Sequence, residues 1–350
     1  MLWHGLWDET YSNPRYAELV PRLERLFFAP VRQRKGAPGR LDGALYRRMR
    51  FVERRTLAWY RAAGLGLLLT PDVDQVPLFD GPAVLDLDDP VMTLREQDGL
   101  RARVLRHVVT PTDEIAEYVR ATNTALGTTV VPQGVDLERA ARARHEETRG
   151  EILRRLGLPL ETPIVGYHAP LIRLSGERGA GNENLRTFDV DVLVSAIRRL
   201  WSDDVPFVTV LVGRPSSAIE ALVREEKHLV LAGYVDRHRL FDWVGTFDVG
   251  TYPRSVDFGG RQSVKLLEYM ANSAAIVAMR THETRLLEKT ASGYVADDAE
   301  HFRDLLRRVL SNRDERLSLI NRGRAVVAEY DWSTLAARYD RVLAGVAGDP

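Results

Sequence analysis

The chain contains no cysteine in its 350 residues, which excludes disulfide bonds and metal sites built on thiolates. Its formal net charge is zero, so no global field attracts nucleic acid. It lacks a long apolar run, and its start has neither the basic residues nor the apolar stretch of a signal peptide. We therefore expect a cytoplasmic protein without a transmembrane helix and without nucleic acid as a partner.

The residues that are present are typical of a soluble α/β protein, with 45% hydrophobic and 28% charged residues. Short apolar runs that suit buried strands alternate with amphipathic segments, which indicates parallel sheets covered by helices on both faces. The expected strands are Leu2–Leu6, Leu26–Val31, Leu65–Thr70, Ala83–Leu87, His107–Thr110, Thr129–Val131, Ile164–Tyr167, Phe207–Val212, His228–Ala232, Val249–Tyr252, Ala275–Met279 and Gly293–Ala296. The expected helices include Arg15–Leu26, Asp113–Arg120, Asp189–Leu200, Ser216–Glu226, Val264–Ala271, Ala299–Ser311 and Arg313–Tyr330.

Two such sets of strands predict two doubly wound, Rossmann-like domains, because 350 residues suffice for two cores. A polar segment rich in Arg and Glu, 136–163, joins the two sets. We expect a first domain over 1–155 and a second over 156–330. A final helix over 331–350 could cross back to the first domain.

The segment Gly259–Val277 carries the clearest chemical signal. A basic loop that begins with two glycines leads into a helix, and the helix leads into an apolar strand. The start of such a helix presents unpaired N–H groups and the positive end of the helix dipole, which suits a phosphate. Arg261 and Lys265 add positive charge there, and Glu268, one turn further on, suits the hydroxyls of a ribose.

The run from Ser263 to Ala271, Ser-Val-Lys-Leu-Leu-Glu-Tyr-Met-Ala, resembles the nucleotide-sugar motif of the family-four, or group-one, glycosyltransferases. The form with lysine before Leu-Leu-Glu-Tyr-Met-Ala is similar to a subgroup that makes or decorates bacterial surface glycans. Many members carry a second, earlier glutamate near the donor sugar, and here that position is Gly260. The resemblance implies nucleotide binding by Gln262, Ser263, Val264 and their neighbours, and leaves the donor sugar open.

Five further stretches resemble the same family in the same order along the chain, namely 130–136, 165–169, 210–213, 231–235 and 330–333. The family has the GT-B architecture, in which two Rossmann-like domains face a central cleft. The resemblance implies an acceptor on the first domain, a nucleotide-diphosphate sugar on the second, and no need for a metal ion.

Several residues of the second domain follow strands at the edge where open parallel sheets bind ligands. Gly166 and His168 follow its first strand, and His168 would point into the cleft or be a surface or capping histidine. The family places a basic residue from the next loop on the diphosphate, and Arg173 is our choice over Arg178. The glycine-rich stretch in that loop, Ser175–Asn184, could be a lid or an insertion.

Two later strands add a glycine and an aromatic residue. Gly213 would let the backbone approach a ligand, and Arg214 could reach a phosphate or simply be exposed. Tyr234 could stack on a nucleobase or pack between strand and helix.

Acidic residues end a buried strand of the first domain. Asp86, Asp88 and Asp89 stand there, and in the family this strand end faces the acceptor. A carboxylate at Asp88 or Asp89 could accept the proton of an attacking hydroxyl, or the acids could cap the next helix. The loop Gly5–Arg15 could line the acceptor site or only start a helix.

The segment 31–61 carries ten basic residues against two acidic ones. Beside them, Leu45, Met49, Val52 and Trp59 could form an apolar stripe. The segment could contact an anionic membrane at the inner face of the cell membrane, or be a solvated helix whose apolar side faces the core.

Together these observations predict a glycosyltransferase that moves a sugar from a nucleotide-diphosphate sugar to a hydroxyl of a glycan, lipid-linked or small-molecule acceptor. The alternative outside enzymes is a degenerate GT-B protein that binds nucleotide sugar or serves as a scaffold subunit. Within enzymes, an epimerase or phosphorylase of the same fold is the alternative. A pyridoxal phosphorylase would need a Schiff-base lysine, and none of the four lysines has a supporting motif.

Overall fold

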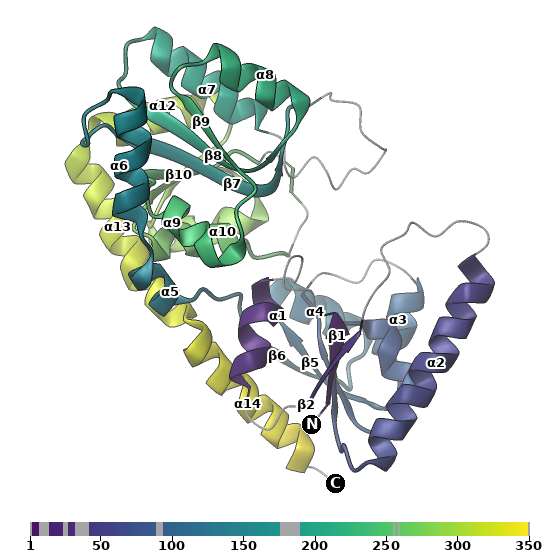
Figure 1. Ribbon diagram of the computed structural model, residues 1–350. Coiled ribbons are helices and arrows are strands. Elements are labelled where there is room, and N and C mark those ends of the chain that lie inside the picture. Colours follow the sequence, from purple (N-terminus) through teal and green to yellow (C-terminus); the bar gives the residue numbers. More distant parts are fainter. Residues whose placement is uncertain are drawn as a thin grey trace. The chain divides into compact units, whose positions relative to one another are not determined.

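The computed structural model describes residues 2–6, 14–23, 27–31, 42–88, 94–175, 190–254, 256–257 and 260–348 (Figure 1). Its strands are β1 Leu2–Leu6, β2 Phe27–Val31, β3 Leu68–Thr70, β4 Ala83–Asp86, β5 Leu105–Thr110, β6 Gly127–Val130, β7 Ile164–Ile172, β8 Val208–Pro215, β9 Leu229–Gly233, β10 Val249–Tyr252, β11 Ala275–Met279 and β12 Tyr294–Ala296. Its α-helices are α1 Pro14–Leu19, α2 Asp42–Ala62, α3 Leu94–Leu100, α4 Asp113–Thr122, α5 Leu137–Arg142, α6 His145–Leu156, α7 Asp191–Ser202, α8 Ser217–Glu225, α9 Leu240–Val244, α10 Val264–Ala271, α11 Arg285–Thr290, α12 Ala299–Ser311, α13 Arg313–Val327 and α14 Trp332–Gly348.

The chain forms two compact units, each with its own parallel sheet. The first unit comprises Met1–Gln133, Gly260–Gln262 and Trp332–Pro350, and the second comprises Gly134–Gly259 and Ser263–Asp331. The six-stranded sheet of the first has the order β2-β1-β3-β4-β5-β6, and that of the second has the order β12-β11-β10-β7-β8-β9. Every pairing between these strands is parallel. Each predicted strand is present, and the doubly wound α/β fold class is confirmed.

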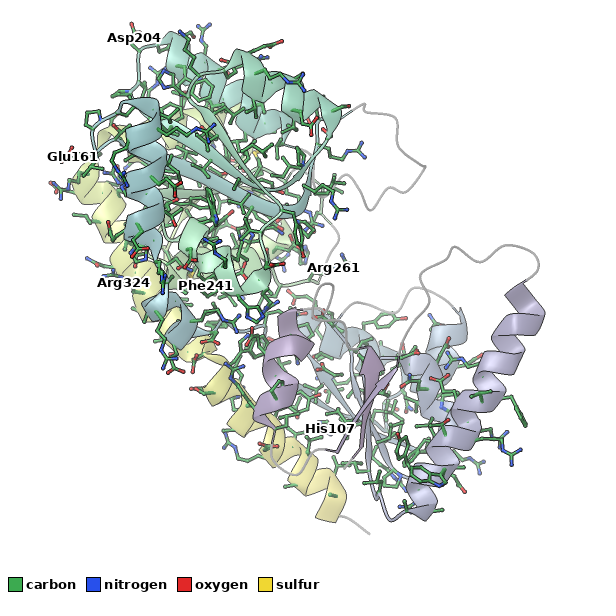
Figure 2. All side chains as sticks on the ribbon, in the orientation of Figure 1. His107, Glu161, Asp204, Phe241, Arg261 and Arg324 are labelled. Atoms are coloured by element: carbon green, nitrogen blue, oxygen red, sulfur yellow. The ribbon has the colours of Figure 1, made fainter. Side chains whose placement is uncertain are left out.

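Helices bury both faces of the sheet of the second unit, and successive strand residues point to opposite faces. Val277 of β11 packs with α7, α8 and α12, whereas its neighbour Ile276 packs with α6, α9, α10 and α13. Phe241 of α9, labelled in Figure 2, belongs to the second of these two layers. Helices therefore cover both faces, as the continuous apolar strands predict.

The first unit repeats this arrangement with the two ends of the chain on one face. Leu85 of β4 packs in a layer that contains Leu57 of α2 and Ile115 of α4. Val84, one residue earlier, packs in the opposite layer with Leu19 of α1 and the final helix α14. Trp332, Leu335, Tyr339 and Leu343 of α14 are all buried in that layer. The last helix thus groups with the first unit.

The boundary between the units lies earlier than the expected 155/156. Residues 134–155 belong to the second unit, because Ile152 and Leu153 of α6 are buried in its core. Arg149 of the same helix also pairs with Asp248 at 2.8 Å. The helix expected over Arg15–Leu26 ends as α1 at Leu19 and continues as a 3₁₀ turn over Val20–Arg22, where Pro21 cannot donate a helical hydrogen bond.

Candidate functional site

The order of strands in the second unit reverses at β7, which lies between β8 and β10. In open parallel sheets, ligands bind beyond the carboxyl ends of the strands at such a switch point. His168 stands on β7, Thr251 on β10, and α10 starts beside them after β10. The candidate site is therefore formed by the residues that β7, β10 and α10 bring together.

His168 and Glu268 form a buried pair at this edge. Nε2 of His168 lies 3.2 Å from Oε2 of Glu268, and each residue is only 6% exposed. Burial by itself would raise the pKa of Glu268, but His168, with further help from Arg237 and Lys265, outweighs that effect and holds the pKa below its ordinary value. Glu268 is therefore a stable anion at neutral pH and can accept hydrogen bonds.

Tyr269 fixes the frame around this pair. Its hydroxyl donates to the carbonyl of Thr251 at 3.1 Å and accepts from the N–H of His168 at 3.4 Å. The Oγ1 of Thr251 in turn donates to the carbonyl of Gly166 at 2.9 Å. The two strands and the helix are thus tied together by hydrogen bonds that do not involve the Glu268 carboxylate.

The start of α10 has the features of an anion site. Ser263 occupies the N-cap position without a capping side-chain hydrogen bond, and the first turn contains no acidic residue. The first turn instead contains the cation Lys265, at the positive end of the helix dipole. This placement of like charges is unfavourable unless an anion binds. Burial lowers the pKa of Lys265, and Glu268 and Glu283 partly offset this effect. A bound diphosphate would restore the favourable charge balance.

A second ionic network at this edge was missed by the sequence interpretation. Arg254, just after β10, donates to both oxygens of Glu283 at 2.8 and 2.7 Å and to the Tyr252 hydroxyl at 2.9 Å. Tyr252 also donates to Glu283. The available signal was position, because Arg254 and Glu283 follow the carboxyl ends of two adjacent strands. Their charges act on Lys265, so they belong to the same electrostatic environment.

The structure gives two predicted ligand-contacting glycines a packing role. A Cβ on Gly166 would overlap the Phe247 ring, with the nearest atom at 2.1 Å. Gly213 has φ of +151°, and a Cβ there would lie 1.9 Å from the carbonyl oxygen of Ala169. Close approach of neighbouring chain segments, rather than of a ligand, is sufficient to explain both residues.

Other predicted residues lie at the ends of β7, β8 and β9. Arg173 is half-buried near the end of β7, whereas Arg178 lies outside the described residues. The guanidinium carbon of Arg214 is 5.9 Å from the ring centroid of Tyr234, which is 48% exposed. This exposed aromatic face, with a cation above it, can stack on a planar group.

In the first unit, Arg15 and Asp86 form an ion pair in the core. Both side chains are fully buried, and Nε of Arg15 lies 3.0 and 2.9 Å from the two carboxylate oxygens of Asp86. Arg15 also donates to the carbonyls of Val131 and Pro132. Of the two interpretations of the loop Gly5–Arg15, the buried pair favours a structural role for Arg15, because its charge is neutralised within the core.

Asp88 differs from Asp86 in being half-buried, and it accepts a hydrogen bond from Nε2 of Gln133. Asp89, the other predicted acid, lies outside the described residues. The predicted catalytic residues thus fall into different units, with Asp88 in the first and His168 in the second.

The loop before α10 is also divided between the units. Gly260, Arg261 and Gln262 group with the first unit, whereas Ser263, Val264 and Lys265 group with the second. Oγ1 of Thr112 donates to the carbonyl of Gly260 at 2.5 Å. Gly260 has φ of +64°, a left-handed conformation that glycine adopts without strain, which accounts for glycine at the position of the family's first glutamate.

In α2, the part of the basic segment that the structure describes, three large apolar residues face solvent. Phe51, Val52 and Trp59 are 59%, 56% and 66% exposed. Arg54 and Arg55 are exposed beside them, and Arg55 lies over the Phe51 ring at 5.6 Å. Arg50 is different, because it pairs with Glu53 and Asp74. Val52 and Trp59 of the predicted stripe are thus turned outward, whereas Leu57 of the same helix is buried in the core.

The described residues contain no group of three or more His, Cys, Asp or Glu side chains placed to hold a metal ion. None of their helices has both the length and the apolar character that crossing a bilayer requires.

Comparison with known proteins shows a likeness to glycosyltransferases. Residues 181–312 match the family model described as "Glycosyl transferases group 1". No curated protein matches the sequence significantly. The match covers α10 and most of the second unit, including Tyr234, Lys265 and Glu268.

Solved structures of low sequence identity share the fold over nearly the whole chain. Anabaena HepE in complex with UDP has a TM-score of 0.69 at 14% identity, covering 98% of this chain and 99% of its own, and HepE is also known with UDP-glucose. Sucrose-phosphate synthase from Thermosynechococcus elongatus has a TM-score of 0.69 at 15% identity, and the match covers 99% of this chain and 98% of that one. WaaG, a glycosyltransferase involved in lipopolysaccharide biosynthesis, has a TM-score of 0.66 at 12% identity, and the match covers 99% of this chain and 100% of that one. The predicted GT-B fold is confirmed by these likenesses.

Proposed function

We propose that the protein is a glycosyltransferase that moves a sugar from a nucleotide-diphosphate sugar to a hydroxyl of a glycan, lipid-linked or small-molecule acceptor. The observation that carries the proposal is the start of α10. It combines an uncapped helix N-terminus, Lys265 in the first turn and the anionic Glu268, within a segment that matches group 1 glycosyltransferases.

Each part of this arrangement has a role in the proposed reaction. The helix dipole and Lys265 would stabilise the negative charge that develops on the departing diphosphate. Glu268, held by His168, would accept hydrogen bonds from the ribose, and Tyr234 would stack on the base. His168 then acts as a positioning residue, since its contact is with Glu268. Asp88 would accept the proton of the attacking hydroxyl.

The nature of the donor is supported by the UDP and UDP-glucose complexes of HepE, and a role in surface glycans by the likeness to WaaG. We infer that the reaction takes place in the cytoplasm. We also infer that it needs no metal ion, because the helix dipole and Lys265 supply positive charge at the anion site.

A thermal-shift screen of nucleoside diphosphates and nucleotide sugars tests the proposal. We expect at least one nucleotide sugar to raise the melting temperature, and Lys265→Ala to abolish that rise. Released nucleoside diphosphate is then measured with octyl glycosides as acceptors. Binding without any turnover would favour a nucleotide-sugar-binding subunit, and no binding by any nucleotide would refute both readings.

We also propose that α2 brings the protein to an anionic membrane. Its exposed Phe51, Val52 and Trp59 form an apolar surface beside Arg54 and Arg55. An amphipathic helix of this kind lies in the interfacial region of a bilayer, and its arginines attract anionic lipid. A lipid-linked acceptor would be reached from such a position.

A further inference from the structure

Gln133 is held at both its side chain and its main chain by residues of the first unit. Its Nε2 donates to Oδ1 of Asp88, and its backbone N–H donates to Oε1 of Gln262 at 2.7 Å. Gln133 is only 3% exposed. The side-chain nitrogen must face Asp88, because an ionised carboxylate only accepts hydrogen bonds.

The other end of this amide makes no such bond. Oε1 of Gln133 is buried and has no hydrogen-bond partner within the described ranges. An unsatisfied buried carbonyl is rare in folded proteins and costs free energy. The amide is therefore oriented by Asp88 rather than by the needs of its own oxygen, which is the arrangement expected of a side chain that serves its neighbour.

The positive charge of Arg15 favours the ionised form of Asp88. Arg15 of α1 interacts electrostatically with Asp88, but its guanidinium is bonded to Asp86 and to two carbonyls. Asp86 at the end of β4 and Tyr339 of α14 are the other titratable groups that act on Arg15 within the described part of the chain. The direct hydrogen bond from Gln133 is thus well suited to set the direction of the Asp88 carboxylate.

We propose that Gln133 is the positioning residue of the acceptor site, orienting the Asp88 carboxylate and keeping it ionised to receive a proton from the acceptor hydroxyl. The proposal rests on the function proposed above. It adds a link between the two substrates, since Gln262 anchors Gln133 and directly precedes Ser263, the N-cap of α10. A shift of Gln262 on donor binding would be transmitted through Gln133 to the acid.

The ionisation of Asp88 tests the positioning role without any substrate. Its carboxyl carbon is followed by ¹³C NMR during a pH titration, with Asp88→Asn identifying the signal. Gln133→Leu removes a donor to the charged form, so the midpoint should rise by about one pH unit. Gln133→Glu adds a like charge and should raise it further. Gln75→Leu is the control, because Gln75 is an equally buried glutamine of the same unit that bonds Thr70 and Glu53.

Turnover gives the second readout, with the nucleotide sugar that stabilises the wild type most and with octyl glycosides as acceptors. We expect Gln133→Leu to lower the transfer rate at least tenfold with unchanged donor affinity, and Gln133→Glu to move the acid limb of the pH–rate profile upward. An unmoved NMR midpoint, or equal losses in Gln133→Leu and Gln75→Leu, would overturn the positioning role. A moved midpoint in a protein that binds no nucleotide sugar would instead refute the proposed function.

Discussion

Nε2 of His168 lies 3.2 Å from Oε2 of Glu268, so a residue predicted to be catalytic and a residue predicted to bind ribose form one buried pair. The pair joins β7 to α10 at the point where the strand order reverses. It stabilises the charged form of Glu268 against the effect of burial. The carboxylate is thereby kept as an acceptor of hydrogen bonds at neutral pH.

A pH dependence of stability follows from this pair. The folded pKa of Glu268 is below the ordinary value of 4.5, so its contribution is fully present above that value and is lost as pH falls through the folded pKa. Urea unfolding of wild type and Glu268→Gln should therefore differ most near neutral pH and converge as the pH falls through the folded pKa of Glu268.

The role of His168 is tested by repeating the comparison in a His168→Asn background. Of the groups that oppose burial, Arg237 and Lys265 then remain, so the pKa of Glu268 should rise and the stability advantage of the carboxylate at neutral pH should shrink. An equal advantage with and without His168 would contradict the pairing.

Donor binding should depend on two residues of α10. Lys265→Ala and Glu268→Ala should each weaken binding of a nucleoside diphosphate by about 1–3 kcal/mol, the scale of a charge-assisted hydrogen bond. Glu268→Ala should weaken the binding of deoxyribonucleotides less, because these lack one of the ribose hydroxyls that Glu268 would accept from. Isothermal titration measures both effects, and the exposed Lys289 of α11 provides the control Lys289→Ala. Wild-type affinity in both α10 variants would refute the site.

The strands and α10 could be predicted because their signals are local. Val249–Tyr252 and Ala275–Met279 are apolar runs of strand length, and α10 lies between a serine and an Asn-Ser pair. The division of the loop before α10 could not be predicted. It depends on Thr112 and Gln133, which reach Gly260 and Gln262 across 148 and 129 residues without any local pattern.

The buried pair of Arg15 and Asp86 illustrates the same limit, and it yields a stability prediction. Arg15→Met removes the cation paired with the fully buried Asp86, which should destabilise the protein by about 3–5 kcal/mol in urea unfolding. The control Arg142→Met breaks a pair with Glu138 whose side chains are 76% and 70% exposed. That change should cost at most about 0.5 kcal/mol. Equal effects would show that the buried charge is compensated in another way.

The acceptor side is tested at Asp88. Asp88→Asn keeps the shape of the side chain but cannot accept a proton, so transfer should fall by about 10²–10⁴ if Asp88 is the base. Nucleotide affinity should stay unchanged, because Lys265 and Glu268 belong to the second unit and Asp88 to the first. Asp80→Asn, at an exposed aspartate of the same unit, should leave both quantities unaltered. Lost nucleotide binding in Asp88→Asn would show that the acid is misassigned.

The α2 surface makes a prediction that needs no substrate. Sedimentation with vesicles containing phosphatidylserine should bring down the protein at low salt and less of it as salt rises. The double change Arg54→Glu and Arg55→Glu should weaken binding at least tenfold, since each lost basic residue removes about 1 kcal/mol. Arg307→Glu with Arg308→Glu, on the exposed side of α12, is the matched control. Equal binding to neutral vesicles would exclude an electrostatic contribution.

The noncontiguous make-up of the first unit restricts how this protein can recombine with its relatives. A chimera with one junction near 133 would take β1 to β6 from one parent and α14 from the other. Trp332, Leu335 and Tyr339 would then meet a sheet face that did not evolve with them. A fragment ending at 155 would lack α14 altogether and would leave Ile152 and Leu153 of α6 without the core that buries them. Functional exchange of the two halves therefore requires two junctions, with 332–350 travelling together with 1–133.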